Sequence, residues 1–239
     1  LHLAAIFLSA VHLALAGFGT YGLARLLGMA PSGSTVAAVS YMFSGWYFYR
    51  MACCPADIST AAWLPVILLT TELALRADPG GYRTLWRLLS AFALAQVISA
   101  WVGPGSYYVV LAFGGYLVYR TLIEPVRALA FIQRVRALIV HGLVVGIASV
   151  GLAAGGLLPR NEFYQHSGLG EGYPTGTPEG WTWFRISERL LGETTWNAGA
   201  VTLGLAMFGV LILRRRFLAP FWLALVLFAI VYATRMDGW

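Results

Sequence analysis

Charged residues are scarce in this chain, and one of the usual types is absent. Asp, Glu, Lys and Arg make up 11% of the 239 residues, and all sixteen basic residues are arginine. A soluble globular domain carries roughly 25% charged residues, so a soluble fold of this length would expose a large apolar surface to water. Hydrophobic residues make up 59% of the chain, and the mean hydropathy is +0.72. The composition therefore predicts that this protein folds in a bilayer.

The sequence also lacks the short motifs of soluble enzymes. It contains no phosphate loop, no HExxH, no CxxC pair and no GxGxxG after a strand-like run. Cys53 and Cys54 are adjacent, and two neighbouring cysteines provide neither a disulfide framework nor a metal site. The net charge of +6 does not indicate nucleic acid, because most arginines lie at the ends of apolar runs. We expect membrane lipids as partners and no nucleic acid.

Long apolar runs predict an all-α polytopic membrane protein with about eight transmembrane helices in a single membrane domain, 1–239. Proline and glycine turns separate most of these runs. We also expect the chain to be part of a longer one, because Leu1 already lies within an apolar run. The expected spans are residues 1–27, 35–50, 58–77, 85–102, 107–122, 137–157, 195–213 and 218–233.

The distribution of arginine predicts how these spans are oriented. With eight spans, eleven arginines fall on one side of the membrane and five on the other. Loops rich in Lys and Arg remain in the cytoplasm, so the arginine-rich side is expected to be cytoplasmic. The long polar loop 158–193, which holds five of the ten acidic residues, is then extracytoplasmic. We expect the protein in a bacterial inner membrane.

Few polar residues in or beside the spans are candidates for chemistry. Glu72 and Arg76 have the spacing of a same-face ion pair, for which a structural role is expected. Arg50 and Asp57 flank one extracytoplasmic turn, where an arginine beside a carboxylate suits a lipid phosphate and a catalytic base or metal ligand. The alternative is that Arg50 is an interfacial anchor and Asp57 a helix N-cap.

Other candidates are weaker. In the polar loop, Glu171, Trp181 and Trp183 could bind a sugar, although a solvated loop is the simpler interpretation. His12 and His141 lie in or near apolar runs, where they could be metal or chlorin ligands or a proton relay. The alternative for both is a histidine hydrogen-bonded to a neighbouring helix. No cofactor is evident, and a divalent metal is compatible with the chain only if it is catalytic.

A series of short motifs recurs in order along the apolar runs. They are Gly17, Gly19 and Tyr21, then Tyr41, Ser44 and Gly45, then Pro55, then Ala62 to Pro65, and then Tyr107 and Tyr108. This order resembles that of the YfhO-type bacterial membrane proteins, and through them the GT-C superfamily of membrane glycosyltransferases. The resemblance covers most of the chain. It implies a multi-span fold that transfers a sugar from a polyprenyl-phosphate donor at the extracytoplasmic face.

Two functions follow from this resemblance and from its departures. The first is a glycosyltransferase-like protein that acts on a polyprenyl-phosphate-linked sugar, in which Arg50 and the polar loop hold the lipid phosphate and the sugar and Asp57 is the catalytic acidic residue. The second is a non-catalytic subunit of a larger integral-membrane complex, for example a photosynthetic or respiratory one. The second stays open because the family's catalytic acid lies in a loop that would precede Leu1. In addition, the family's His-Pro pairs are replaced here by Cys54-Pro55 and Gly103-Pro104.

Overall fold

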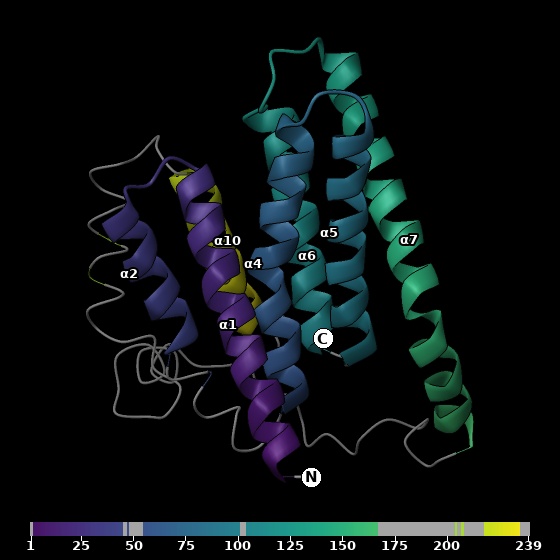
Figure 1. Cartoon of the computed structure of the whole chain (residues 1–239). Helices are drawn as coiled ribbons and strands as arrows, with labels where there is room; N and C mark the ends of the chain where they lie inside the picture. Colours follow the sequence, from purple (N-terminus) through teal and green to yellow (C-terminus); the bar gives the residue numbers. More distant parts are fainter. Residues whose placement is uncertain are drawn as a thin grey trace. The chain divides into compact units, whose positions relative to one another are not determined.

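The computed structural model describes residues 2–44, 47, 55–100, 104–166, 204, 207 and 218–234. Throughout this part of the chain the regular elements are helices, which confirms the all-α prediction (Figure 1). A single π-helical turn, η1 (Tyr119–Ile123), continues α6. The α-helices are α1 (His2–Leu26), α2 (Pro31–Met42), α4 (Pro55–Arg76), α5 (Gly81–Ala100), α6 (Pro104–Val118), α7 (Phe131–Gln165) and α10 (Ala219–Thr234).

Three helices in the described ranges are long and apolar enough to cross a membrane. They are the segments Ile6–Leu26 of α1, Ala56–Arg76 of α4 and Phe131–Gln165 of α7. The third has 35 residues and is therefore about 52 Å long, which exceeds the roughly 30 Å of a bilayer's hydrocarbon core. These helices make the chain a possible membrane protein, as its composition predicts.

The prediction of eight spans is not confirmed, because the described residues give three helices of this kind. Helices α2 and α6 have 12 and 15 residues, which is short for a crossing. Helix α5 has 20 residues but carries Arg83 and Arg87 in its first two turns. The apolar part of α10, Ala219–Val231, is also short. The expected span 195–213 and the loop 158–193 lie largely outside the described residues.

The chain divides into two compact units, Leu1–Met42 with Arg50–Leu157 and Phe43–Tyr49 with Leu158–Trp239. In the first unit, α4 packs against α1, α5 and α6 (Figure 1). Glycines allow the closest of these contacts. A Cβ added at Gly19 of α1 would lie 3.1 Å from the backbone nitrogen of Val66 in α4. One turn further on, Gly22 faces Leu69, so α1 and α4 run in the same direction.

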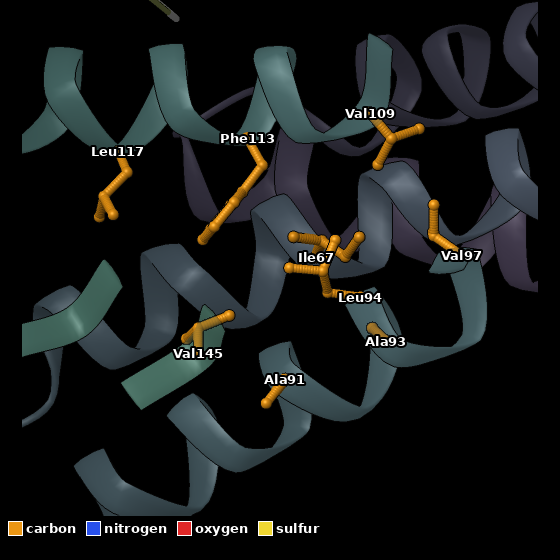
Figure 2. Packing of buried hydrophobic residues seen from close by; sticks show 9 residues of the cluster. All are labelled: Ile67, Ala91, Ala93, Leu94, Val97, Val109, Phe113, Leu117 and Val145. Carbon is orange, nitrogen blue, oxygen red and sulfur yellow. The ribbon is translucent and has the colours of Figure 1, made fainter. Parts of the chain in front are cut away.

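The apolar core of this unit lies between α4, α5, α6 and α7 (Figure 2). The small side chains of Ala91 and Ala93 allow α5 to lie close to the neighbouring helices. The Ser90 hydroxyl of α5 hydrogen-bonds the Thr70 hydroxyl of α4 at 2.7 Å. Helix α7 contributes one face to the interior, with His141, Val145, Ser149 and Ala153 all buried at four-residue intervals. The core cluster consists of Ile67, Ala91, Ala93, Leu94, Val97, Val109, Phe113, Leu117 and Val145.

Basic residues gather at one end of the first unit, which is the upper end in Figure 1. Helices α1, α4 and α6 end there, and α5 and α7 begin there. Every arginine among the described residues of this unit lies at this end, which we call the arginine-rich end. The eight residues are Arg25, Arg76, Arg83, Arg87, Arg120, Arg127, Arg134 and Arg136.

Candidate functional site

A fully buried carboxylate, that of Glu72, lies at the centre of the arginine-rich end. Glu72 is in the penultimate turn of α4, and the guanidinium of Arg120 in η1 forms two hydrogen bonds with its carboxylate. The Arg120 Nε donates to Glu72 Oε2 at 2.9 Å, and its Nη2 donates to Oε1 at 2.7 Å. This two-bond geometry is the strongest that an arginine and a carboxylate form.

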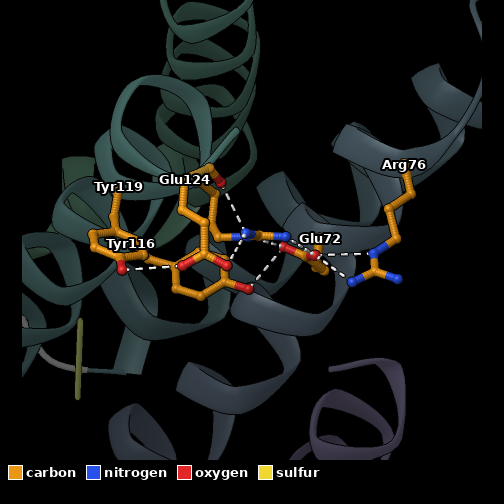
Figure 3. A network of polar contacts seen from close by, with 6 residues as sticks. Glu72, Arg76, Tyr116, Tyr119 and Glu124 are labelled. Carbon is orange, nitrogen blue, oxygen red and sulfur yellow. Dashed lines mark hydrogen bonds and ion pairs between the residues drawn. The ribbon is translucent and has the colours of Figure 1, made fainter. Parts of the chain in front are cut away.

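Two further donors complete the surroundings of Glu72. Arg76, one turn later in α4, donates from its Nε to Oε1 at 2.9 Å, and Tyr116 of α6 donates its hydroxyl to Oε2 at 2.9 Å (Figure 3). Each carboxylate oxygen therefore accepts at least two hydrogen bonds. A carboxylate held in this way is poorly suited to take up a substrate proton, so its role is to join α4 to α6.

The structure confirms the Glu72–Arg76 pair, but sequence analysis missed Arg120 and Tyr116. They lie 48 and 44 residues after Glu72, and only the packing of α4 against α6 brings them together. One feature of the sequence could have indicated Arg120. It comes directly after the strongly apolar helix α6, and a charged side chain in such a place needs a partner of opposite charge.

The π-helical turn η1 positions Arg120. The turn is closed by a hydrogen bond from the Glu124 backbone nitrogen to the carbonyl of Tyr119, five residues earlier, at 2.8 Å. Such turns are rare and are often found at functional sites. From this turn the Arg120 Nη1 also donates to the Glu124 carbonyl at 2.8 Å, while the Tyr119 hydroxyl donates to the Glu124 carboxylate at 3.1 Å. Arg120 is thereby held between α4 and the end of its own helix.

Two other arginines cover the carboxyl end of α4. Arg83 donates from Nε and Nη2 to the Ala77 carbonyl at 2.9 and 2.7 Å, and Arg127 donates to the Arg76 carbonyl at 2.6 Å. Positive charge here complements the helix dipole. Burial and the neighbouring Arg127 lower the pKa of Arg83 from its ordinary value, although an arginine remains charged at neutral pH.

Asp57 lies at the opposite end of α4 from Glu72. The two residues are fifteen positions apart in one helix, or about 22 Å along its axis. The side chain of Asp57 is buried, and its backbone carbonyl accepts a 2.8 Å hydrogen bond from the Thr60 hydroxyl. The predicted N-cap role is wrong, because α4 begins at Pro55 and Asp57 is already in the first turn. A proline is well suited to that first position.

The two candidate histidines lie in different helices. His12 of α1 hydrogen-bonds through Nδ1 to the Leu8 carbonyl at 2.8 Å, and its ring lies edge-on to Trp63 at 6.5 Å. His141 of α7 is fully buried beside Phe113, and no described group hydrogen-bonds either of its ring nitrogens. Across the described residues, no group of three or more His, Cys, Asp or Glu is placed to hold a metal ion.

The remaining predicted site residues lie outside the described residues. They are Arg50, Glu171, Trp181 and Trp183. The structure therefore leaves their suggested role in binding a lipid phosphate or sugar as a prediction.

Comparison with known proteins adds no relative to this picture: no protein-family model, no curated protein and no solved structure matches the chain. The fold and the site define its class. Its described residues form an all-α fold with three helices of membrane-crossing length and a buried charge network at one end of the first unit.

Proposed function

We propose that the chain is an integral-membrane protein whose arginine-rich end faces the cytoplasm. Apolar side chains on the outer face of α7 support the membrane insertion. On α7, Leu143, Ile147 and Val150 are 57%, 71% and 54% exposed, and they share the face opposite the buried one. Water would disfavour such a surface, whereas lipid would solvate it. Helices α5 and α6 pack in the same core and would lie in the same layer.

We further propose that this membrane protein acts like a GT-C glycosyltransferase on a polyprenyl-phosphate-linked sugar at the arginine-poor face. The observation that carries the proposal is the location of Asp57. Among the described acidic residues of the first unit, Asp57 alone lies at that end, whereas Glu72, Asp78 and Glu124 lie at the other. The resemblance to YfhO-type proteins supplies the reaction class.

In this mechanism the Asp57 carboxylate acts as a general base on the acceptor. It takes the proton of an acceptor hydroxyl, whose oxygen then attacks the anomeric carbon of the donor sugar. The bond between the sugar and polyprenyl phosphate breaks, and the phosphate leaves with the bonding electrons. Arg50 would hold the phosphate through its guanidinium.

The test uses the purified protein in lipid nanodiscs with a radiolabelled polyprenyl-phosphate-linked sugar. Asp57→Asn is expected to reduce sugar release or transfer by roughly 10²-fold or more while donor binding persists. Arg50→Ala is expected to reduce donor binding itself. Glu162→Gln is the matched control, since Glu162 is an exposed carboxylate near the end of α7. Full turnover in Asp57→Asn, or unchanged binding in Arg50→Ala, would refute the proposal.

The second candidate function, a non-catalytic subunit of a membrane complex, is favoured by the glycines of α7. Gly151 and Gly155 are exposed, lie four residues apart, and have open space where a Cβ would be. This spacing lets a second membrane helix approach closely. A subunit of this kind should co-purify with other membrane proteins in fixed stoichiometry, and Gly151→Leu should weaken that association. A chain that purifies alone and is catalytically active would exclude this function.

A further inference from the structure

A half-open pocket beside the Glu72 network is lined by five arginines. It has a volume of about 50 Å³ and lies between the carboxyl end of α4, the start of α5, the turn η1 and the start of α7. None of the described acidic residues lines it. The arginines are Arg83, Arg87, Arg120, Arg127 and Arg134, and the other lining residues are Ala74, Leu75, Thr121, Pro125, Val126, Leu129 and Ala137.

Two of these arginines are neutralised by carboxylates. Arg120 binds Glu72 with both arms, as described above. Arg127 donates from Nη2 to Asp78 Oδ1 at 2.9 Å, although this carboxylate is 95% exposed and is therefore shared with solvent. These two contacts hold the walls of the pocket in place.

The other three arginines form no ion pair with a carboxylate in the described part of the chain, although the charge of Asp78 acts on Arg83. Arg83 donates to the Ala77 carbonyl, and Arg134 donates from Nε to the Leu129 carbonyl at 2.7 Å. The Nε of Arg87 is buried, and no described group accepts a hydrogen bond from it. Three positive charges thus converge on one pocket, and one of them has a buried donor left unsatisfied. A buried donor without an acceptor is costly, so a bound anion that accepts from it would be stabilised.

We propose that this pocket binds the phosphate of an anionic lipid headgroup. Phosphate oxygens match the fork of a guanidinium and accept strong charge-assisted hydrogen bonds from it. The volume favours one such group, because it is well below the roughly 300 Å³ of a pocket for a larger organic ligand. A nucleotide or a free sugar would not be enclosed.

The surroundings favour a phosphate attached to a lipid. Half of the lining residues are apolar. Next to the pocket in sequence, Ile123, Phe131 and Ile132 are 68%, 68% and 72% exposed at the end of η1 and the start of α7. Exposed apolar side chains beside arginines are typical of the membrane–water interface, where anionic headgroups lie. This assignment depends on membrane insertion but not on the glycosyltransferase activity.

The test measures lipid binding to the purified protein by native mass spectrometry with defined lipids. The wild-type protein is expected to retain phosphatidylglycerol in preference to phosphatidylcholine. Arg87→Gln and Arg134→Gln are each expected to weaken phosphatidylglycerol binding by roughly tenfold. Arg136→Gln is the matched control, because Arg136 lies two residues from Arg134 at the same end, does not line the pocket, and changes the net charge equally.

Three outcomes would overturn the assignment. The first is equal weakening in all three variants, which would indicate general attraction of a basic surface. The second is binding of inorganic phosphate with no discrimination between the two lipids, which would indicate a soluble anion as the ligand. The third is retention of phosphatidylglycerol in both pocket variants. Because Arg87 and Arg134 lie on different helices, a folding defect in one variant leaves the other informative.

Discussion

Breaking the buried Glu72 network should strongly destabilise the first unit, and Glu72→Gln tests this directly. The substitution keeps the shape of the side chain but removes its charge. Arg120, whose side chain is 7% exposed, then loses its main counterion. In addition, the new amide NH₂ must replace one acceptor oxygen and would face a donor. Removing one partner of a buried ion pair costs about 3–5 kcal/mol.

The surroundings of Glu72 indicate that the cost of Glu72→Gln in the free energy of unfolding lies at the lower end of that range. Arg120 keeps the Glu124 carbonyl as an acceptor, and Arg76 is 40% exposed, so water can solvate it. We therefore expect a loss of about 3 kcal/mol in the free energy of unfolding. For a chain of this size this corresponds to a fall of roughly 6–12 °C in the unfolding temperature. Equilibrium unfolding in mixed micelles, followed by circular dichroism, would measure it.

A double substitution tests whether the cost arises from an unpaired buried charge. Replacing both Glu72 and Arg120 with apolar residues of similar size, as in Glu72→Leu with Arg120→Met, should recover much of the loss, because no charge is left unpaired. A loss below about 0.5 kcal/mol in Glu72→Gln would refute the network's role. Strict additivity of the effects at Glu72 and Arg120 would refute their coupling.

Further predictions concern packing, hydrogen bonding and orientation. Gly19→Ala should separate α1 from α4 and cost about 1–3 kcal/mol, whereas Gly146→Ala, with open space around it, should be neutral or slightly stabilising in the same unfolding assay. Tyr116→Phe should cost about 1–2 kcal/mol through one lost hydrogen bond to Glu72. A cysteine placed at exposed Asp78, in a protein without its native cysteines, should react with an impermeant thiol reagent only after cells are opened. Labelling in intact cells would contradict the cytoplasmic orientation.

Several features of this protein follow from patterns among neighbouring residues in the sequence. An apolar run long enough to cross a bilayer is expected to be a helix, so the helical class and the positions of α1 and α4 could be predicted. Helix α7 was predicted only in part, because it continues to Gln165 whereas residues 158–165 were expected in the polar loop. The pair Glu72 and Arg76 could be predicted too, because a spacing of four within one helix brings side chains together whatever surrounds them.

The number of spans could not be predicted in the same way. Apolar composition marks a segment as buried but does not say whether protein or lipid covers it. Helix α5 illustrates the difficulty, since it mixes core alanines and Leu94 with exposed Leu88 and with Arg87 near its start. The expected span 58–77 also begins later than α4, whose first residue is Pro55, because a proline at the first helical position is compatible with a helix start.

By itself, the sequence determined a helical, strongly apolar chain whose arginines lie at the ends of its helices, because these are properties of neighbouring residues. Only the tertiary structure decided which of those ends meet. Packing of α4 against α6 brings Arg120 and Tyr116 to Glu72 across more than forty residues, and the approach of α5 and α7 turns separate arginines into one pocket. Contacts between distant segments depend on how the helices pack, and the spacing of neighbouring residues in the sequence does not predict that packing.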